Sequence, residues 1–587
     1  MHEKAADRKQ NPNSTLRSLF SDEHTVMVLL GIVVGVAGGY GAVGFRYLIN
    51  FIQSIAYGSP SELLEVVGSI PWHLRILIPA AGGLIVGPIV YFFAREAKGH
   101  GVPEVMYAVA MKHGIIRKRI VFIKAFVSAV CIGTGGSVGR EGPIVQIGSA
   151  VGSSLGQLFN VSGNRIRTMV GCGAAAGIAA TFNAPIAGSI FALEIILGEF
   201  EIISFSPIII SAVSATAISR HYLGDIPAFI LPEYVLHSPM EFPLYAIMGI
   251  FCAAVAVAFT LFLYRTEDFW DAIKFPEYFK AVLGGLIMGS MGLVFPQILG
   301  VGYGAIDLAL MGKMSWWLMG LLVLLKILAT SITIGSGGSG GIFAPSLFIG
   351  AMAGGMFGMV AHQFCPAVVL SPGAYAVVGM GAVVAATTHG PLQAILIIFE
   401  MTGDYKIILP LMITCIISTL VARKLCGESI YTFKLIRRGI NIRGGKEVNI
   451  LNAMYVKNVM YRTVEMVSES LHLTEFAKKL PKSKTNNFIV VNDQEELTGI
   501  LTFLDYYDNL FNDKLNDDMV VKDIMTPDVV TVTIEDHLGT ALEKITAGDF
   551  SILPVVSASN PLKMLGILTR RDILEAYDQA VIKRAIV

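Results

Sequence analysis

Two ionisable residues, Arg140 and Glu141, stand side by side within a long apolar part of the chain. They belong to a glycine-rich stretch at 133–152, GTGGSVGREGPIVQIGSAVG. Charges at membrane depth are costly and therefore indicate a functional site by default. Glycine-rich backbone followed by Pro143 and an apolar run is typical of a loop that begins a helix. A helix start offers free N–H groups and a positive dipole end to an anion, so the stretch predicts an anion site buried in a membrane.

The composition of the chain supports this membrane setting. Of 587 residues, 54% are hydrophobic and 15% are charged, whereas soluble domains carry about 25% charged residues. Basic and acidic residues balance at 44 each, and no basic block indicates nucleic-acid binding. The six cysteines are scattered through apolar segments without metal-type or disulfide-framework spacing, so we expect buried thiols and no metal site.

Apolar segments fill residues 25–425 and are of two kinds. The long ones are sufficient to cross a hydrocarbon core of about 30 Å, and they include 26–48, 74–93, 245–264, 281–298, 316–334 and 407–422. Shorter, glycine-interrupted ones predict half-helices that end inside the membrane, which is tolerated only where protein or a watery cavity surrounds the ends. These are 144–158, 186–197, 346–360 and 392–399.

The apolar segments recur as an internal repeat. GSGGSGGIFAPSLFIGAMAG, at 335–354, matches 133–152 with one constant offset (335 − 133 = 202). TFNAPIAGSIFALE, ending at Glu194, pairs in the same way with TTHGPLQAILIIFE, ending at Glu400. A two-fold repeat of interrupted segments is typical of transporters, which bind substrate near the midplane at the repeat interface.

Two lysines, Lys124 and Lys326, stand nine residues before the two glycine-rich stretches. As cations in apolar segments, they either raise the local positive potential for an anion or extend their ammonium groups to the membrane surface. The sequence leaves both alternatives open.

The chain changes character after residue 440. Residues 441–450 form a predicted linker, and 451–587 repeat internally, with VKNVM, FIVV and GILTFLD recurring as VKDIM, LPVV and GILTRRD. Short β-rich runs alternate with amphipathic stretches at 471–480 and 538–547, so we predict a soluble α+β pair, 451–515 and 516–587.

Basic residues at both ends of the apolar region favour cytoplasmic termini. The polar tail 1–24 lacks the apolar core of a signal peptide. The basic residues are Lys4, Arg8, Lys9 and Arg17 in that tail, and Arg437, Arg438 and Arg443 after the last apolar segment.

The motifs GREGP, GGIFAP, GMGAVVAATTHGPLQAILIIFEMTGDY and ESIYTF make residues 25–440 resemble the CLC family of chloride channels and chloride/proton antiporters. The tail is similar to a tandem pair of CBS (cystathionine β-synthase) domains. The resemblance implies an all-α polytopic membrane domain of two inverted repeats with half-helices, about 25–222 and 240–440, followed by a cytoplasmic CBS pair. It also implies a homodimer in membrane lipid with one pore per subunit, which transports a small anion such as chloride and does not act as an enzyme.

The resemblance also assigns an anion path. Glu141 is the expected gate, a carboxylate that occupies the outer anion site and leaves it when protonated. Backbone N–H groups and the Tyr431 hydroxyl are expected to face the central anion, because donors without a fixed charge bind an ion and still release it. The alternatives are core packing for Phe343, an interfacial position for Tyr431 and a structural pair for Arg140 and Glu141. The expected anion-binding residues are His100, Gly101, Gly139, Arg140, Gly142, Gly341, Ile342, Phe343 and Tyr431.

Two positions depart from the family pattern. In GHGVPEV, His100 stands where chloride-type members have a serine, and either its imidazole N–H or only its backbone N–H faces the anion. Ile195 stands where similar proton-coupled members carry an inner glutamate that accepts protons. Isoleucine cannot carry a proton, which favours a gated chloride channel; a secondary active antiporter with another proton route is the alternative. Glu194 and Glu400 are expected to be structural partners of helix ends.

The tail carries the pattern Gly-h-h-Thr-x-x-Asp twice, at Thr502/Asp505 and at Thr569/Asp572. In the CBS family this pattern can hold the phosphate and ribose of an adenine nucleotide, and the alternative is a structural or dimerising module. We expect no required cofactor. A nucleotide sensor with the membrane part as a mere anchor is disfavoured by the intact GREGP and GIFAP motifs.

Overall fold

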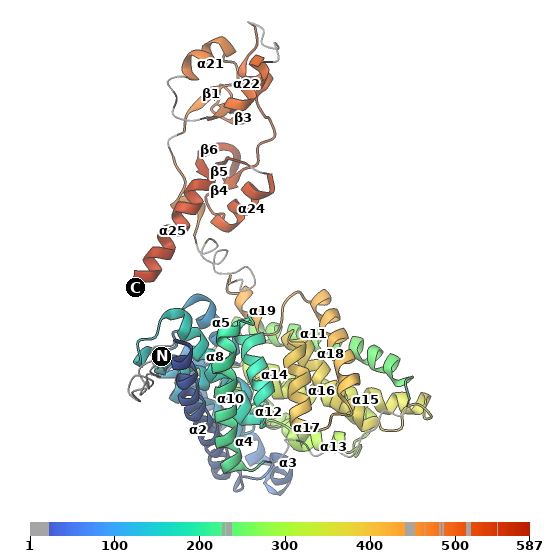
Figure 1. The fold of residues 1–587 in the computed structure, drawn as a ribbon. Helices are drawn as coiled ribbons and strands as arrows, with labels where there is room; N and C mark the ends of the chain where they lie inside the picture. Colours follow the sequence, from blue (N-terminus) through green and yellow to red (C-terminus); the bar gives the residue numbers. More distant parts are fainter. Residues whose placement is uncertain are drawn as a thin grey trace, which may run out of the picture. The chain divides into compact units, whose positions relative to one another are not determined.

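The computed structural model of the chain describes residues 23–225, 229, 238–440 and most of the tail: 451, 454–462, 464–480, 483, 486–511, 518–548 and 550–586. The chain divides into two compact units, 1–438 and 439–587, both of which are drawn in Figure 1. The basic residues expected to orient the N-terminal tail, the linker 441–450 and Arg443 lie outside the described residues.

The first unit is built from helices, and eight described helices are long and apolar enough to cross a membrane. The predicted long segments are confirmed as helices, although the segment expected at 281–298 is helical only to Val294. The residue before a proline avoids helical backbone, and Phe295 before Pro296 has φ −128° and ψ 76°. The eight are α2 (Glu23–Tyr57), α4 (Trp72–Phe93), α10 (Ile202–Leu223), α11 (Glu241–Ala272), α12 (Glu277–Val294), α14 (Trp316–Gly335), α15 (Phe343–Phe364) and α18 (Ile408–Leu425).

Shorter helices complete this unit. The prediction of a half-helix at 346–360 is wrong, because α15 has 22 residues and reaches spanning length. The shorter elements are α3 (Leu63–Val66), α5 (Val102–Met111), α6 (Ile120–Gly133), α7 (Glu141–Leu158), α8 (Gly163–Phe182), α9 (Pro185–Phe191) with the π-helical turn η3 (Ala192–Leu197), α13 (Tyr303–Leu310), α16 (Pro372–Thr388), α17 (Pro391–Thr402) and α19 (Thr432–Ile436).

The glycines inside α7 serve close packing against α8. A Cβ at Gly148 would overlap the carbonyl of Gly173, and a Cβ at Gly152 would overlap the carbonyl of Met169. Glycine weakens an isolated helix by about 1 kcal/mol relative to alanine. Here the contact with α8 outweighs that propensity, so the loop predicted from glycine content ends at Arg140 and the rest of the stretch is helical.

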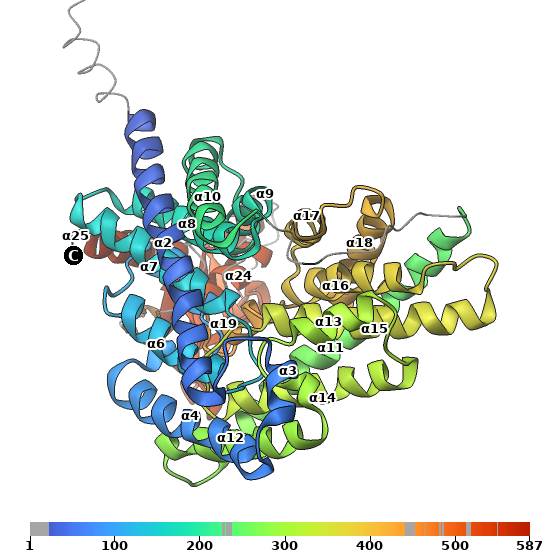
Figure 2. The same ribbon diagram turned by 90° about the horizontal axis from the view of Figure 1, so that it is seen from below.

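The sequence repeat is also a spatial repeat. Helices that are equivalent in the two halves contact one another, α4 with α12 and α9 with α17, as Figure 2 shows. Equivalent turns share their backbone conformation: Gly101 and Gly302 have φ of 81° and 89°, and Asn183 and His389 have φ of 58° and 57°. These self-paired contacts are what two halves related by a pseudo-two-fold axis produce.

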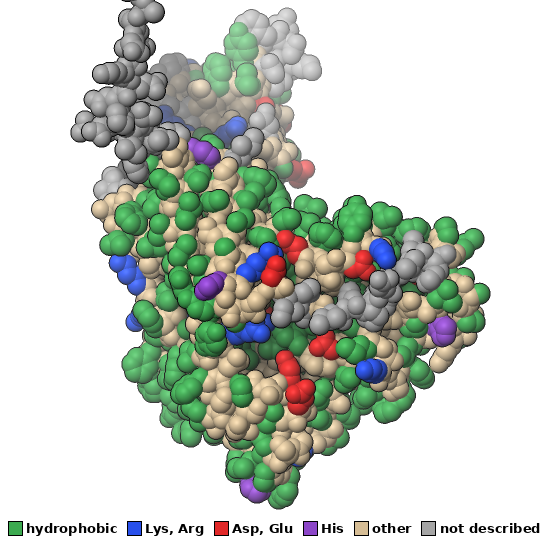
Figure 3. Space-filling view, turned by 60° about the horizontal axis from the view of Figure 1, so that its bottom comes forward, with side chains coloured by type: hydrophobic (Ala, Val, Ile, Leu, Met, Phe, Trp, Pro, Cys, Tyr) green, Lys and Arg blue, Asp and Glu red, His purple; other side chains and the backbone are tan. Residues whose placement is uncertain are grey.

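The surface of the helical unit is strongly apolar. Exposed side chains include Phe122, 77% exposed, and Ile55, 71% exposed. In Figure 3 hydrophobic side chains cover much of the visible face of this unit, with acidic and basic side chains gathered in a few places. Soluble monomers rarely expose apolar patches larger than a few hundred Å², so this surface is suited to lipid.

The second unit contains two three-stranded sheets of the same design. In each, the first strand pairs parallel with the second, and the second pairs antiparallel with the third. The predicted α+β pair is confirmed. The first sheet has β1 (Met466–Ser468), β2 (Asn487–Val491) and β3 (Leu497–Thr502), with α21 (Leu473–Lys479) and α22 (Phe503–Phe511); the second has β4 (Val532–Thr533), β5 (Ile552–Ser557) and β6 (Asn560–Thr569), with α24 (Leu538–Gly548) and α25 (Arg570–Ile586).

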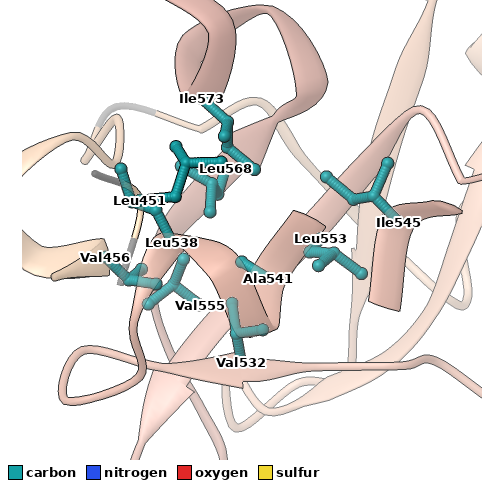
Figure 4. Close-up of a cluster of buried hydrophobic side chains, with 10 residues drawn as sticks. All are labelled: Leu451, Val456, Val532, Leu538, Ala541, Ile545, Leu553, Val555, Leu568 and Ile573. Carbon is teal, nitrogen blue, oxygen red and sulfur yellow. The ribbon is translucent and has the colours of Figure 1, made fainter. Parts of the chain in front are cut away.

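The two halves of the tail exchange their first segments. Leu451 and Val456 belong to the core around the second sheet, with Leu538 and Val555, as Figure 4 shows. Reciprocally, α23 (Val521–Ile524) packs into the core around the first sheet. Each core therefore contains segments from both predicted halves. The predicted boundary at 515/516 divides the sequence repeat, but both cores include residues from either side of it.

Candidate functional site

Three glycine-containing loops meet inside the helical unit, immediately before α5, α7 and α15. The N–H of Gly139 donates to the carbonyl of Gly341 at 2.7 Å, and the N–H of Gly341 donates back at 2.6 Å. The N–H of Gly340 donates to the carbonyl of Gly99 at 3.3 Å, which joins the loop before α5 to the same junction. Three helix starts, with their free N–H groups, therefore converge on one point.

The convergence depends on the absence of side chains. A Cβ at Gly142 would overlap the carbonyl oxygen of His100 and lie 2.9 Å from Cα of Gly341. A Cβ at Gly341 would lie 2.6 Å from the nitrogen of Gly142, and Gly101 has φ +81°, which L side chains rarely adopt. The structure thus brings the predicted glycines of all three loops together.

Glu141, the predicted gate, is the first residue of α7 and is buried. Its Oε1 accepts a hydrogen bond from the Tyr303 hydroxyl at 2.9 Å. Its Oε2 fills the space beside Gly139, where an added Cβ would overlap it and would lie 3.2 Å from the backbone nitrogen of Ala344. Oε2 makes no hydrogen bond within the described part of the chain. A carboxylate oxygen thus lies beside the starts of α7 and α15.

Tyr303 is a site residue that the sequence analysis missed. It is the first residue of α13, its ring lies 5.5 Å from that of Phe229, and the Arg140 guanidinium carbon lies 5.3 Å from the ring centroid. GVGYGAID at 300–307 is the repeat partner of GHGVPEV at 99–105, but at an offset of 201 (300 − 99). The offset differs by one residue from the 202 of the other repeated stretches, and the equivalent first-half residue, Val102, has no hydroxyl.

Ile342 and Phe343 form the start of α15, and both are buried. The Phe343 ring packs 5.6 Å from the Phe182 ring, centroid to centroid. The ring is therefore part of the core. The first N–H groups of a helix have no partner within the helix, so this packing leaves the backbone of the pair available to a ligand.

His100 and Tyr431 lie together, with ring centroids 5.8 Å apart, and both are buried. The Tyr264 hydroxyl on α11, a second residue that the sequence analysis missed, lies 3.4 Å from Nε2 of His100 and donates to the carbonyl of Ile430. Because that hydrogen is directed at Ile430, the hydroxyl oxygen is available as an acceptor for Nε2 of His100 in the tautomer that carries its hydrogen there. Nδ1 makes no hydrogen bond to the described residues.

A polar cavity of about 260 Å³ adjoins Tyr303 and Arg140. Its walls also include Arg46, Glu62 and Gln297. Arg140, which was expected to bind the anion, thus lines this cavity and faces the Tyr303 ring.

The two repeat-related lysines support the loops of the site. Lys124 donates to the carbonyls of Ala97 and Gly99 at 2.9 and 2.8 Å, just before α5. Lys326 donates to the carbonyls of Ile298 and Gly300 at 3.1 and 3.0 Å, just before α13. Both lysines are 0% exposed, which contradicts the second of the two alternatives, that they extend to the membrane surface.

Glu194 and Glu400 bind helix starts, as predicted. Each accepts hydrogen bonds from the start of the repeat-related helix in the other half. Glu194 accepts from the N–H of Gln393 at 2.8 Å, in the first turn of α17. Glu400 accepts from the N–H of Ala187 at 2.7 Å, in the first turn of α9. Ile195, named above as the position where the inner proton acceptor is lost, is buried, and its side chain packs against Gly390.

In the tail, both Thr-x-x-Asp motifs form the same helix cap. Asp505 accepts from the N–H and hydroxyl of Thr502 at 2.8 and 2.7 Å, and Asp572 accepts from those of Thr569 at 2.9 and 2.6 Å. Asp572 also lines a cavity of about 370 Å³, together with Tyr461.

Comparisons with known proteins agree with this geometry. The model of the voltage gated chloride channel family matches residues 82–423, and that of the CBS domain matches 521–579. A putative chloride channel protein, ClcB-like, of Ralstonia nicotianae is 34% identical over 70% of this chain and 97% of its own. The H(+)/Cl(-) exchange transporter ClcA of Vibrio parahaemolyticus is 33% identical over 70% and 89%. A slow cyanobacterial Cl⁻/H⁺ antiporter of known structure is 29% identical, with TM-score 0.65, over 70% and 97%.

Proposed function

Because this chain belongs to the voltage gated chloride channel (CLC) family of chloride transport proteins, we propose that it is a gated chloride channel in which Glu141 is the gate. The observation that carries this proposal is the buried carboxylate of Glu141 at the junction of three helix starts, with Oε2 lacking a hydrogen bond to the described residues.

The proposed gate works by competition for one site. A carboxylate and a halide both seek N–H groups at a positive helix end. Here the first turn of α15 lies next to Oε2 of Glu141. Protonation removes the negative charge of the carboxylate, so the protonated side chain competes poorly and an anion takes its place.

The proposed anion-binding residues are those that border this junction. The backbone N–H groups of the helix starts supply donors without a fixed charge, which permits both binding and release. The ring of Tyr431 lies beside that of His100, and the Tyr431 hydroxyl and the His100 backbone are the proposed anion donors at this point. A bromide ion located by anomalous scattering more than about 5 Å from these groups would contradict the assignment. The proposed set is His100, Gly101, Gly139, Gly142, Gly341, Ile342, Phe343 and Tyr431. Arg140, which lines the cavity of about 260 Å³, is also proposed to attract the anion through its positive charge.

Ile195 supports conduction without proton coupling. A buried isoleucine side chain packs where similar proton-coupled members carry an ionisable residue. The alternative, a secondary active anion/proton antiporter, is favoured by a specific observation: the similar ClcA proteins are named exchange transporters, and the similar cyanobacterial structure is titled an antiporter.

Measuring the reversal potential in planar bilayers under a pH gradient separates the two mechanisms. With purified protein and equal chloride on both sides, a channel is expected to reverse at 0 mV whatever the pH difference. The current of a coupled antiporter is expected to reverse away from 0 mV. The proton gradient, which is equivalent to about 59 mV per pH unit, then drives exchange. A reversal potential that moves with the pH gradient would contradict the channel mechanism.

We also propose a homodimer with one pore per subunit, in the cell membrane, with both termini in the cytoplasm. The apolar surface of the helical unit supports the membrane location, and the likeness to CLC proteins supports the dimer. A monomeric mass in detergent by light scattering would contradict the dimer.

A second proposed function is regulation by an adenine nucleotide at the tail. The cavity of about 370 Å³ beside Asp572 and Tyr461 supports it, because it pairs a carboxylate suited to ribose hydroxyls with an aromatic ring suited to a base. ATP, ADP or AMP is expected to raise the melting temperature of the full-length protein, and Asp572→Asn is expected to reduce the shift. Asp505→Asn is the matched control, since Asp505 has the same cap hydrogen bonds. If none of the three nucleotides shifts the melting temperature, the nucleotide proposal fails and the tail is a structural or dimerising module.

A further inference from the structure

The Tyr303 hydroxyl is the only side-chain donor to Glu141 among the described residues. Its bond to Oε1 is 2.9 Å long. Tyr303 and Glu141 come from different halves of the repeat, from the first turns of α13 and α7. A hydrogen bond to an ionised acceptor is stronger than one between neutral groups, so this hydroxyl stabilises the carboxylate where it lies.

The position of Tyr303 is fixed by its surroundings. Lys326 donates to the carbonyls of Ile298 and Gly300, which secures the loop immediately before α13. The ring of Tyr303 meets Phe229 edge-on, and the Arg140 guanidinium lies over it. Because these contacts already hold the phenol ring in place, little side-chain entropy is lost when its hydroxyl donates to Glu141.

We propose that Tyr303 is a positioning residue that holds the Glu141 carboxylate in its blocking position, so that an anion must displace the carboxylate from this hydroxyl as well as from the helix starts. This inference rests on the proposed gate. It adds a determinant of how readily the gate opens, supplied by α13 and not by the anion-binding loops themselves.

The other charged and titratable groups around this pair are Arg140, next to Glu141 in the chain, Arg46 on α2, Glu62 before α3, and Tyr431 before α19. All of them remain in a Tyr303→Phe variant. The variant removes one oxygen atom and keeps the ring that Arg140 and Phe229 contact, so its effect reports on the hydroxyl.

Tyr303→Phe is expected to move the pH of half-maximal anion flux upward by about one unit, because losing the donor disfavours the ionised carboxylate. Chloride affinity at neutral pH, measured by calorimetry in detergent, is expected to rise about tenfold, because the competitor is held less tightly. Tyr57→Phe is the matched control: Tyr57 is buried and donates to the carbonyl of Thr134 at 2.9 Å and not to Glu141, so neither quantity should change.

A double variant separates this inference from the proposed gate. In a Glu141→Gln background, adding Tyr303→Phe is expected to change neither the flux profile nor the chloride affinity. If Glu141→Gln removes the pH dependence but Tyr303→Phe alone behaves as the wild type, the Tyr303 inference fails and the gate stands. If Glu141→Gln leaves the pH dependence intact, both fail.

Discussion

Replacing Glu141 with glutamine is expected to abolish the pH dependence of anion flux, with the flux at about pH 7.5 rising to the acidic plateau. The carboxylate lies beside the start of α15, and in the proposed gate its charged form excludes a halide there. Glutamine has nearly the same size but carries no charge at any pH, so it resembles the permanently protonated gate. Liposome flux at about pH 4.5 and 7.5 measures the effect: the ratio of the two fluxes is expected to fall to about one.

The helical unit provides matched controls for this substitution. Glu194 and Glu400 are also carboxylates bound to helix starts, each accepting two backbone N–H groups. They lie at α17 and α9, away from the junction of the anion loops. Glu194→Gln and Glu400→Gln are expected to keep the wild-type pH profile. A Glu141→Gln variant that retains the pH profile would remove Glu141 from the gating role.

The sequence was sufficient to locate this junction because its residues repeat. Gly139 and Gly341 correspond at the offset of 202, and the structure joins these two residues by a pair of hydrogen bonds. Equivalent positions near a pseudo-two-fold axis lie close together, so a repeat in sequence identifies contacts in space. The same reasoning succeeded for Glu194 and Glu400, which bind helix starts that are equivalent in the repeat.

The residues that sequence reasoning missed do not follow that symmetry. Tyr303 corresponds to Val102 in the first half, which has no hydroxyl, so the repeat gave no sign of a donor at this position. Tyr264 reaches His100 from α11, a long helix whose pattern is that of any apolar span. A single tyrosine in such a helix carries no local pattern that tells which side chain it meets.

The tail shows a different limit. VKNVM and VKDIM are a repeat in the sequence, but each segment packs with the sheet of the other half. The backbone confirms the exchange, since the N–H of Val456 donates to Asp536 and that of Val521 donates to Leu471. Because the two copies are similar, either pairing satisfies the hydrophobic pattern equally well. Only the three-dimensional connections distinguish them.

Gly142→Ala is expected to weaken chloride binding about tenfold or more and to reduce anion flux correspondingly. Alanine would favour the helix by about 1 kcal/mol on propensity alone. The added Cβ, however, would meet two backbone groups, the carbonyl of His100 and Cα of Gly341. Neither can rotate away, so the loops must separate, and overpacking of this kind costs about 1–3 kcal/mol. Calorimetric titration with chloride and liposome flux measure the result.

Gly44→Ala is the matched control for this prediction. Gly44 lies in α2, is exposed, and an added Cβ there would meet nothing within 4 Å. Gly44→Ala gains the same helix propensity and makes no new contact. Its chloride affinity and anion flux are expected to equal those of the wild type, and its melting temperature is expected to stay the same or rise. If Gly142→Ala behaves like Gly44→Ala, the three helix starts do not need their observed close approach, and an anion site built from their converging N–H groups is untenable.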